Sequence, residues 1–108
     1  MSGLAQTGAS LVHRSAGGGE LWVSGAIGSW PDAVDAVIDL EGGLDPVQVP
    51  YGAVYAAMPI SDGPVDFDLR RVSALARLVA ELLEQGAHVL VHCGAGINRA
   101  NLVAGTAL

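Results

Sequence analysis

The segment His88-Val-Leu-Val-His92 constrains the fold of this chain more than any other feature of the sequence. It is short and almost wholly apolar, and it follows a longer segment, from Leu69 to Gly86, in which apolar residues recur at helical spacing. Such a run is typical of a strand that is buried on both faces of a parallel sheet. The order of strand and helix patterns along the chain therefore predicts a small α/β fold, with a central, mostly parallel sheet flanked by helices.

The other expected elements are shorter. Asp66 or Asp68 is suited to cap the long helix, and Ser29-Trp-Pro-Asp32 has the composition of a helix start, because proline is favoured in the first helical turn. The pair Gly42-Gly43 is a turn signal. Three further strands are expected, over residues 20–24, 36–40 and 53–58.

Length and composition set limits on the class of protein. With 108 residues the chain has room for one domain. Residues 1–19 are rich in Gly, Ala and Ser and are expected to form a mobile N-terminal arm, which leaves residues 20–108 for the domain. The net charge of −6 argues against nucleic acid or an anionic membrane as a partner, and no apolar run approaches the ~20 residues of a membrane span. Cys93 is the single cysteine, so no intrachain disulfide can form and a cytoplasmic location is expected.

The segment that carries chemistry runs from His92 to Arg99, between the apolar strand and a further helical pattern. Successive backbone N–H groups in a tight, glycine-rich loop form an anion site, and the positive end of the following helix adds to it. Arg99 supplies a planar guanidinium that matches two phosphate oxygens. A Cys93 thiol in this field is expected to ionise readily, and the thiolate is the form that attacks. The arrangement therefore predicts a phosphate site with a nucleophile, and the alternative is a structural thiol buried in a glycine turn.

The stretch Val91-His-Cys-Gly-Ala-Gly-Ile-Asn-Arg99 resembles the signature of the protein tyrosine and dual-specificity phosphatases, and the short chain fits the dual-specificity branch best. The resemblance extends from about Leu21 to the end of the chain. It implies a dual-specificity-phosphatase-like fold and the hydrolysis of phosphoesters of proteins or small molecules, with no cofactor or metal. It also implies that Cys93 is the nucleophile and that His92 supports the charge of the thiolate, although His92 equally suits an ordinary strand end. The implied phosphate loop consists of Gly94, Ala95, Gly96, Ile97, Asn98 and Arg99, with Arg99 as the phosphate clamp.

A general acid must protonate the leaving oxygen when a phosphoester is cleaved. Trp30-Pro31-Asp32 matches the letters of the acid loop in tyrosine phosphatases, but it lies upstream of at least two expected strands and the long helix. In the family, the acid loop directly precedes the helix that leads into the catalytic strand, and Asp62 occupies that position. The resemblance therefore assigns Asp62 as the acid, with Asp66 and Asp68 as the other candidates, and leaves Asp32 as a helix-start residue.

Two features depart from the family pattern. Ala100 follows the arginine where the family usually has Ser or Thr, and the chain ends at Leu108, inside the helix that should follow the loop. We therefore expect a domain that is truncated at the C-terminus, or one that covers the apolar face of this helix by self-association. Two other functions are consistent with the loop. One is a pseudophosphatase that binds phosphorylated ligands without turnover, and the other is a rhodanese-like sulfurtransferase or arsenate reductase.

Overall fold

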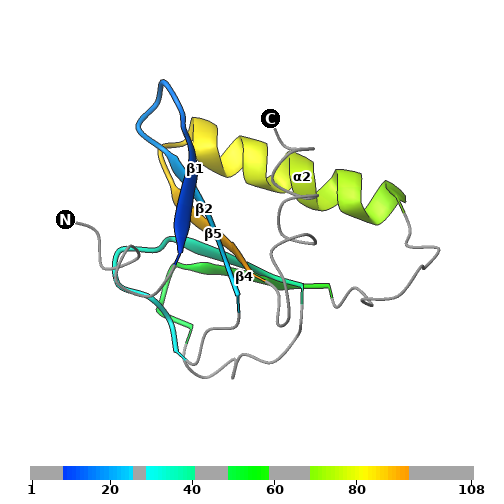
Figure 1. The fold of residues 1–108 in the computed structure, drawn as a ribbon, viewed down its shortest axis with the longest axis horizontal. Helices are drawn as coiled ribbons and strands as arrows, with labels where there is room; N and C mark the ends of the chain where they lie inside the picture. The colour runs from blue at the N-terminus through cyan, green and yellow to red at the C-terminus, as the bar shows by residue number, and fades with distance from the viewer. Residues whose placement is uncertain (1–8, 26–28, 41–48, 59–68, 93–108) are drawn as a thin grey trace.

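The computed structural model describes residues 9–25, 29–40, 49–58 and 69–92 of the chain. Five strands form one mixed sheet in the order β1-β2-β5-β3-β4, and a helix lies across it (Figure 1). β2, β5, β3 and β4 are parallel, whereas β1 pairs antiparallel with β2 at one edge. The expected small α/β architecture is therefore confirmed for these residues. The elements are β1 (Ser10–Arg14), β2 (Glu20–Ser24), β3 (Ala36–Asp39), β4 (Val54–Ala57), α2 (Leu69–Glu84) and β5 (His88–His92).

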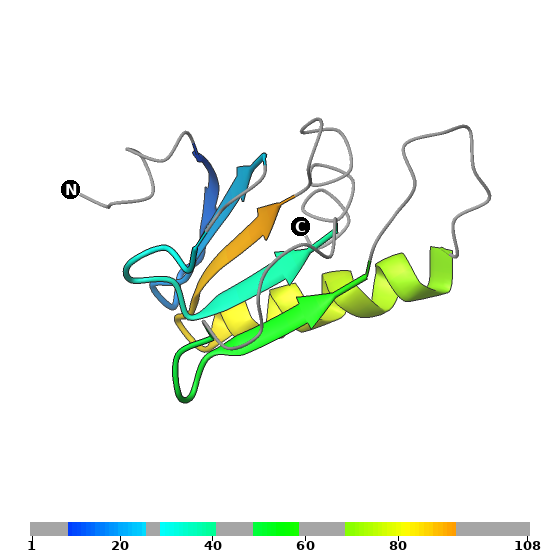
Figure 2. The same ribbon diagram turned by 90° about the horizontal axis from the view of Figure 1, so that it is seen from below.

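β5 lies at the centre of the sheet, although it follows the other four strands in the sequence. It pairs with β2 on one side and with β3 on the other (Figure 2). Val89, Leu90 and Val91 are each fully buried, so the expected burial of this strand on both faces is confirmed. The chain leaves the described region at the end of β5, in the middle of the sheet.

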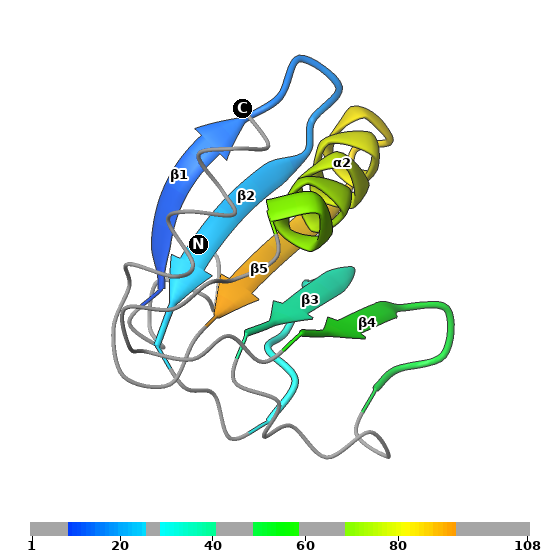
Figure 3. The same cartoon turned by 90° about the vertical axis from the view of Figure 1, so that its right-hand side faces the viewer.

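α2 covers one face of the sheet (Figure 3). Its buried residues Val72, Ala76, Val79 and Leu83 recur every three or four positions and so form a single stripe along the helix. The helix ends beside the start of β5, where Gln85 and Gly86 close its last turn. No helix in the described part of the chain is long and apolar enough to cross a membrane. The stripe packs against strand residues that share one face of the sheet: Leu21, Val23, Ala36, Ile38, Val89 and Val91.

The opposite face of the sheet carries a second, more aromatic cluster. Because strand residues alternate between faces, the residues between those that contact α2 lie here. Burying one Val or Leu side chain contributes about 1.5–3 kcal/mol, so both faces of the sheet contribute to stability. The cluster consists of Ala9, Trp22, Val34, Val37 and Leu90, with Trp30 and Tyr55 packed against it.

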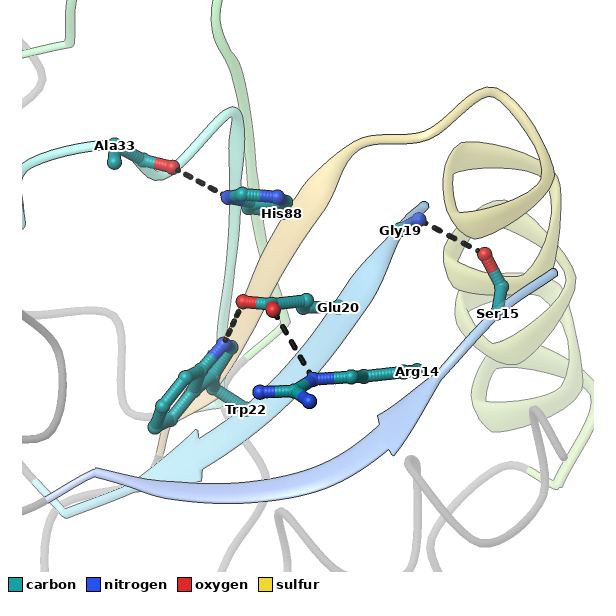
Figure 4. A network of polar contacts seen from close by, with 7 residues as sticks. All are labelled: Arg14, Ser15, Gly19, Glu20, Trp22, Ala33 and His88. Atoms are coloured by element: carbon teal, nitrogen blue, oxygen red, sulfur yellow. Dashed lines mark hydrogen bonds and ion pairs between the residues drawn. The ribbon is translucent and has the colours of Figure 1, made fainter. Parts of the chain in front are cut away.

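Residues 10–14 form β1, although the composition indicated an arm up to residue 19. The hydroxyl of Ser15 accepts a hydrogen bond from the N–H of Gly19 at 2.9 Å, as Figure 4 shows, and donates one to the carbonyl of Leu83 at 2.8 Å. Gly17, Gly18 and Gly19 therefore close a hairpin against the end of α2, and these residues belong to the sheet rather than to an arm. A glycine run has the same composition in a linker and in a tight packed turn, so composition alone does not separate the two.

The expected helix start at residues 29–32 is also wrong, because these residues form a turn that leads into β3. The indole N–H of Trp30 donates to the carbonyl of Val34 at 2.9 Å. Asp35 and His88 exchange two hydrogen bonds, from Asp35 N–H to the His88 carbonyl and from His88 N–H to Asp35 Oδ2, each 2.8 Å long. Pro and Asp are favoured in turns as well as in first helical turns, and pairing with β5 decides between the two.

Gly19→Asn is expected to lower the free energy of unfolding by about 1–3 kcal/mol, the usual cost of overpacking. A Cβ at this position meets main-chain atoms of α2, including Leu83 Cα at 2.9 Å, and main-chain atoms cannot rotate away. Gly18→Asn is the matched control, because a Cβ there meets no atom within 4 Å and Asn tolerates its φ of +92° better than other residues. Urea unfolding compares the two variants. Equal losses would show that close approach to α2 is not the reason for glycine at position 19.

Candidate functional site

The carboxyl ends of the four parallel strands lie together at one end of the sheet, which we call the carboxyl edge. Ligands of open α/β sheets bind at this end of the strands. Figure 3 shows the arrowheads of β2, β5, β3 and β4 on the same side. The last residues are also direct register partners: Ser24 lies opposite His92, His92 opposite Asp39, and Asp39 opposite Ala57. A single row of residues therefore crosses the sheet at its carboxyl edge. We take this row as the candidate functional site.

Asp39 and His92 form a buried ionisable pair at the centre of this row. The imidazole Nε2 lies 3.2 Å from Asp39 Oδ1, and the two side chains are 2% and 0% exposed. Both follow residues of the cluster under α2, Ile38 and Val91, so they lie on the other face of the sheet. A carboxylate that is removed from water needs an opposite charge or hydrogen bonds to remain ionised.

Tyr55 provides the second contact of the Asp39 carboxylate. Its hydroxyl donates a hydrogen bond of 2.6 Å to Asp39 Oδ2, from the neighbouring strand β4. Its ring packs against the aromatic cluster on the same face. The two carboxylate oxygens of Asp39 thus contact different strands, His92 of β5 on one side and Tyr55 of β4 on the other. Three adjacent parallel strands meet in one polar network.

Hydrogen bonds also fix the main chain at the carboxyl edge. The N–H of Leu40 donates to the carbonyl of His92 at 2.9 Å, and the N–H of Met58 donates to the carbonyl of Asp39 at 2.9 Å. Ser24 is buried beside His92, and its hydroxyl donates to the carbonyl of Gly25 at 2.9 Å, which is a local structural contact. The ladder of hydrogen bonds therefore continues to the last residue of β5 and determines where the chain enters the segment that begins with Cys93.

Of the residues that the sequence singled out for chemistry, His92 lies within the described part of the chain. The structure buries its ring and places it against Asp39, which fits both the supporting role and an ordinary strand-end histidine. The other candidates lie outside the described residues: Cys93, Gly94, Ala95, Gly96, Ile97, Asn98, Arg99, Asp62, Asp66 and Asp68.

Asp32 lies at the opposite edge of the sheet from His92. It belongs to the turn before β3, where the carbonyl of Ala33 lies 3.2 Å from Nδ1 of His88, the first residue of β5 (Figure 4). The length of β5 therefore separates Asp32 from His92, about 13 Å at the usual rise of a strand. The letters Trp-Pro-Asp therefore occur at the amino edge of the sheet.

The amino edge carries a further polar network, also drawn in Figure 4. Glu20 accepts a hydrogen bond from the indole N–H of Trp22 at 3.1 Å and pairs with Arg14 Nε at 3.3 Å. The Arg14 side chain is 70% exposed, and exposed ion pairs contribute at most about 1 kcal/mol. The network has a structural role, because it holds β1 against β2. It does not suggest a second site.

Asp39 and Tyr55 are the members of the candidate site that sequence reasoning missed. The available signal was a carboxylate inside an otherwise apolar strand, Ala36-Val-Ile-Asp-Leu40. Asp is seldom fully buried unless it is paired, so its position near the end of a buried strand indicated a partner at the carboxyl edge. Tyr55 gave no such signal, because an aromatic residue in a strand is ordinary.

Comparisons with protein-family models, curated proteins and solved structures gave no match to this chain. Membership of the phosphatase family therefore remains a hypothesis that depends on the loop and its setting.

Tyr55→Phe is expected to lower the free energy of unfolding by about 1.5–3 kcal/mol, the usual value of a hydrogen bond to a charged acceptor. The variant removes only the hydroxyl that donates to Asp39. Tyr51→Phe is the matched control, because Tyr51 is fully exposed and should give no measurable change. Chemical denaturation of the two variants checks this. A Tyr55 variant as stable as the Tyr51 variant would contradict the role given to the network.

Proposed function

We propose that this chain is a cysteine-dependent phosphatase that hydrolyses phosphoesters of proteins or small molecules through a phosphocysteine intermediate. The proposal includes a dual-specificity-phosphatase-like fold and a cytoplasmic location. One observation carries it: the segment from Cys93 to Arg99 directly follows β5, the central strand, at the carboxyl edge of a parallel sheet. A phosphatase loop of this kind requires such a strand before it, and parallel sheets bind ligands at this edge.

The loop sequence suits a dianionic phosphate group in an otherwise acidic protein. The net charge of −6 gives no general attraction for anions, so the attraction has to be local. Gly94 and Gly96 permit the backbone angles that direct successive N–H groups at one ligand. Arg99 adds a planar guanidinium that binds two phosphate oxygens at once. The same groups stabilise the charge on the phosphoryl group during transfer.

The proposed reaction has two steps. In the first, the thiolate of Cys93 forms a bond to phosphorus while the bond to the leaving oxygen breaks, and Asp62 gives its proton to that oxygen. In the second, water attacks phosphorus, Asp62 takes a proton from the water, and the sulfur–phosphorus bond breaks. Inorganic phosphate leaves and the thiolate is restored. Neither step needs a metal or an organic cofactor.

Ala100 supports a second candidate, a protein that binds phosphorylated ligands without turnover. In the resembled family a Ser or Thr hydroxyl at this position donates to the sulfur and assists the second step. A methyl group removes that hydrogen bond, which is worth about 1.5–3 kcal/mol. Steady-state release of phosphate from an aryl phosphate distinguishes the two candidates, because a binding protein gives none. A thiosulfate:cyanide assay tests the sulfurtransferase alternative.

Cys93→Ser is expected to abolish hydrolysis of para-nitrophenyl phosphate and to retain binding of inorganic phosphate or vanadate, because the backbone amides and Arg99 remain. Arg99→Lys should lose both, since a point charge does not reproduce the bidentate fork. Turnover assays and calorimetric titration with vanadate measure the two properties. Activity of the Cys93 variant above a few per cent of wild type would place the nucleophile elsewhere.

Asp62→Ala is expected to reduce kcat by about 10²–10⁴-fold on alkyl phosphates, the usual value of general acid catalysis. The loss should be smaller on para-nitrophenyl phosphate, whose leaving group needs little protonation. Asp32→Ala is the matched control and should leave both rates unchanged, because Asp32 lies in the turn at the amino edge. A leaving-group dependence in the Asp32 variant rather than the Asp62 variant would reverse the assignment.

A further inference from the structure

The buried pair of Asp39 and His92 is not explained by the fold alone. Ser24, Asp39 and His92 are the buried polar side chains among the described residues, and all three lie in the row at the carboxyl edge. Burying an ion pair usually gains no stability over apolar residues of the same volume, because both charges lose their hydration. The other buried residues of β3 and β5 are Ala, Val, Ile and Leu. A pair of this kind at the end of the strand that leads to Cys93 therefore points to a role in the chemistry.

We propose that Asp39 is a positioning residue for Cys93, which acts through His92 and keeps the imidazole charged and oriented beside the nucleophile. This inference rests on the proposed function. Asp39 does not touch the substrate or the reacting atoms. Its carboxylate favours the imidazolium form of His92, because an opposite charge at ion-pair distance stabilises the protonated ring. The positive charge then favours the thiolate form of the next residue in the chain.

The orientation of the Asp39–His92 pair decides whether its charges favour or disfavour a thiolate at Cys93. Asp39 contacts Nε2, the ring nitrogen further from the main chain, so its negative charge lies beyond the ring. Nδ1 is attached to Cγ and lies on the main-chain side, from which Cys93 follows. Within the pair, the imidazole belongs to the residue that is bonded to Cys93 along the chain, and the carboxylate belongs to a different strand. A positive charge on the preceding residue favours a thiolate, whereas a negative charge disfavours it.

The neighbouring strands hold this arrangement and add no opposing charge. β4 contributes Tyr55, which donates to the second oxygen of Asp39 and limits rotation of the carboxylate. β2 contributes Ser24, which is uncharged and bonded to its own neighbour. In the function that we propose, Arg99 and Asp62 are the charged residues assigned to the reaction, and a positive Arg99 favours a thiolate as a positive His92 does. The hydrogen bond from Leu40 to the carbonyl of His92 holds the main chain at the same point.

The experiment uses the fact that Cys93 is the only cysteine in the chain, so alkylation by iodoacetamide reports on that thiol alone. The rate constant is measured against pH on the full chain, with the single adduct counted by mass spectrometry. Asp39→Asn keeps the size of the side chain and an acceptor for Tyr55, and it removes the charge. We expect it to raise the midpoint of the profile by about one pH unit and to lower the rate at a pH below both midpoints about tenfold.

Asp35→Asn is the matched control. It is the same substitution just before the same strand, and it weakens the acceptor for the N–H of His88 at the amino edge. It should leave the midpoint unchanged. The double variant Asp39→Asn/His92→Asn should have the same midpoint as His92→Asn alone, because Asp39 acts through the imidazole and the two effects are not additive.

One measurement needs no variant. Nitrogen chemical shifts of the His92 ring in the wild-type chain should be those of an imidazolium throughout the pH range in which Cys93 ionises. A neutral ring in that range overturns the proposal even if the Asp39 variant does not fold. An unchanged midpoint in a folded Asp39→Asn variant also overturns it. If the midpoint shifts but the chain hydrolyses no phosphoester, the positioning role of Asp39 is supported and the proposed phosphatase function is wrong. Failure of the positioning role can therefore be distinguished from failure of the proposed function.

Discussion

The parallel pairing of β5 with β2 and β3 is the interaction on which the rest of the structure depends. Each central strand satisfies its main-chain donors and acceptors only when both neighbours are in place, and an unpaired buried amide is costly. The partners on one side, Glu20 and His88, are far apart in the sequence, so forming this pair closes a long loop at a cost in chain entropy. The placement of β5 between β2 and β3 creates both apolar faces of the sheet. It also brings the end of β5 to the middle of the carboxyl edge.

The placement of β5 between β2 and β3 also explains why Asp39, His92 and Tyr55 form their polar network at the carboxyl edge. Parallel strands in register bring their last residues into one row, so Asp39 and His92 become direct partners without any local sequence relation. Tyr55 joins them because its strand is the next in the sheet. Burying the network removes its polar groups from water, and the contacts among its members offset part of that cost. In the function that we propose, the position of this network at the end of the strand that precedes Cys93 explains that cost.

Several elements were predictable from the sequence because their patterns repeat. The stripe of Val72, Val79 and Leu83 identified the helix, and the unbroken apolar run of β5 identified its burial. The failures have a common physical cause. Residues 29–32 and the glycines before β2 have local preferences that fit two structures equally well, and hydrogen bonds to His88 and Leu83 select one of them. Those partners are distant in the sequence, so no local pattern contains them.

The sequence by itself determined the chemistry that we propose, because the residue types and spacing from His92 to Arg99 are a local property of the chain. It also determined the class of fold, through the alternation of apolar strands with a long amphipathic helix. The strand order was decided only by the tertiary structure, and with it the choice of Asp39 as the partner of His92 and the separation of Asp32 from that edge. The physical reason is that a buried charge selects its partner by proximity across the sheet, and proximity between strands is set by long-range pairing rather than by neighbours in the chain.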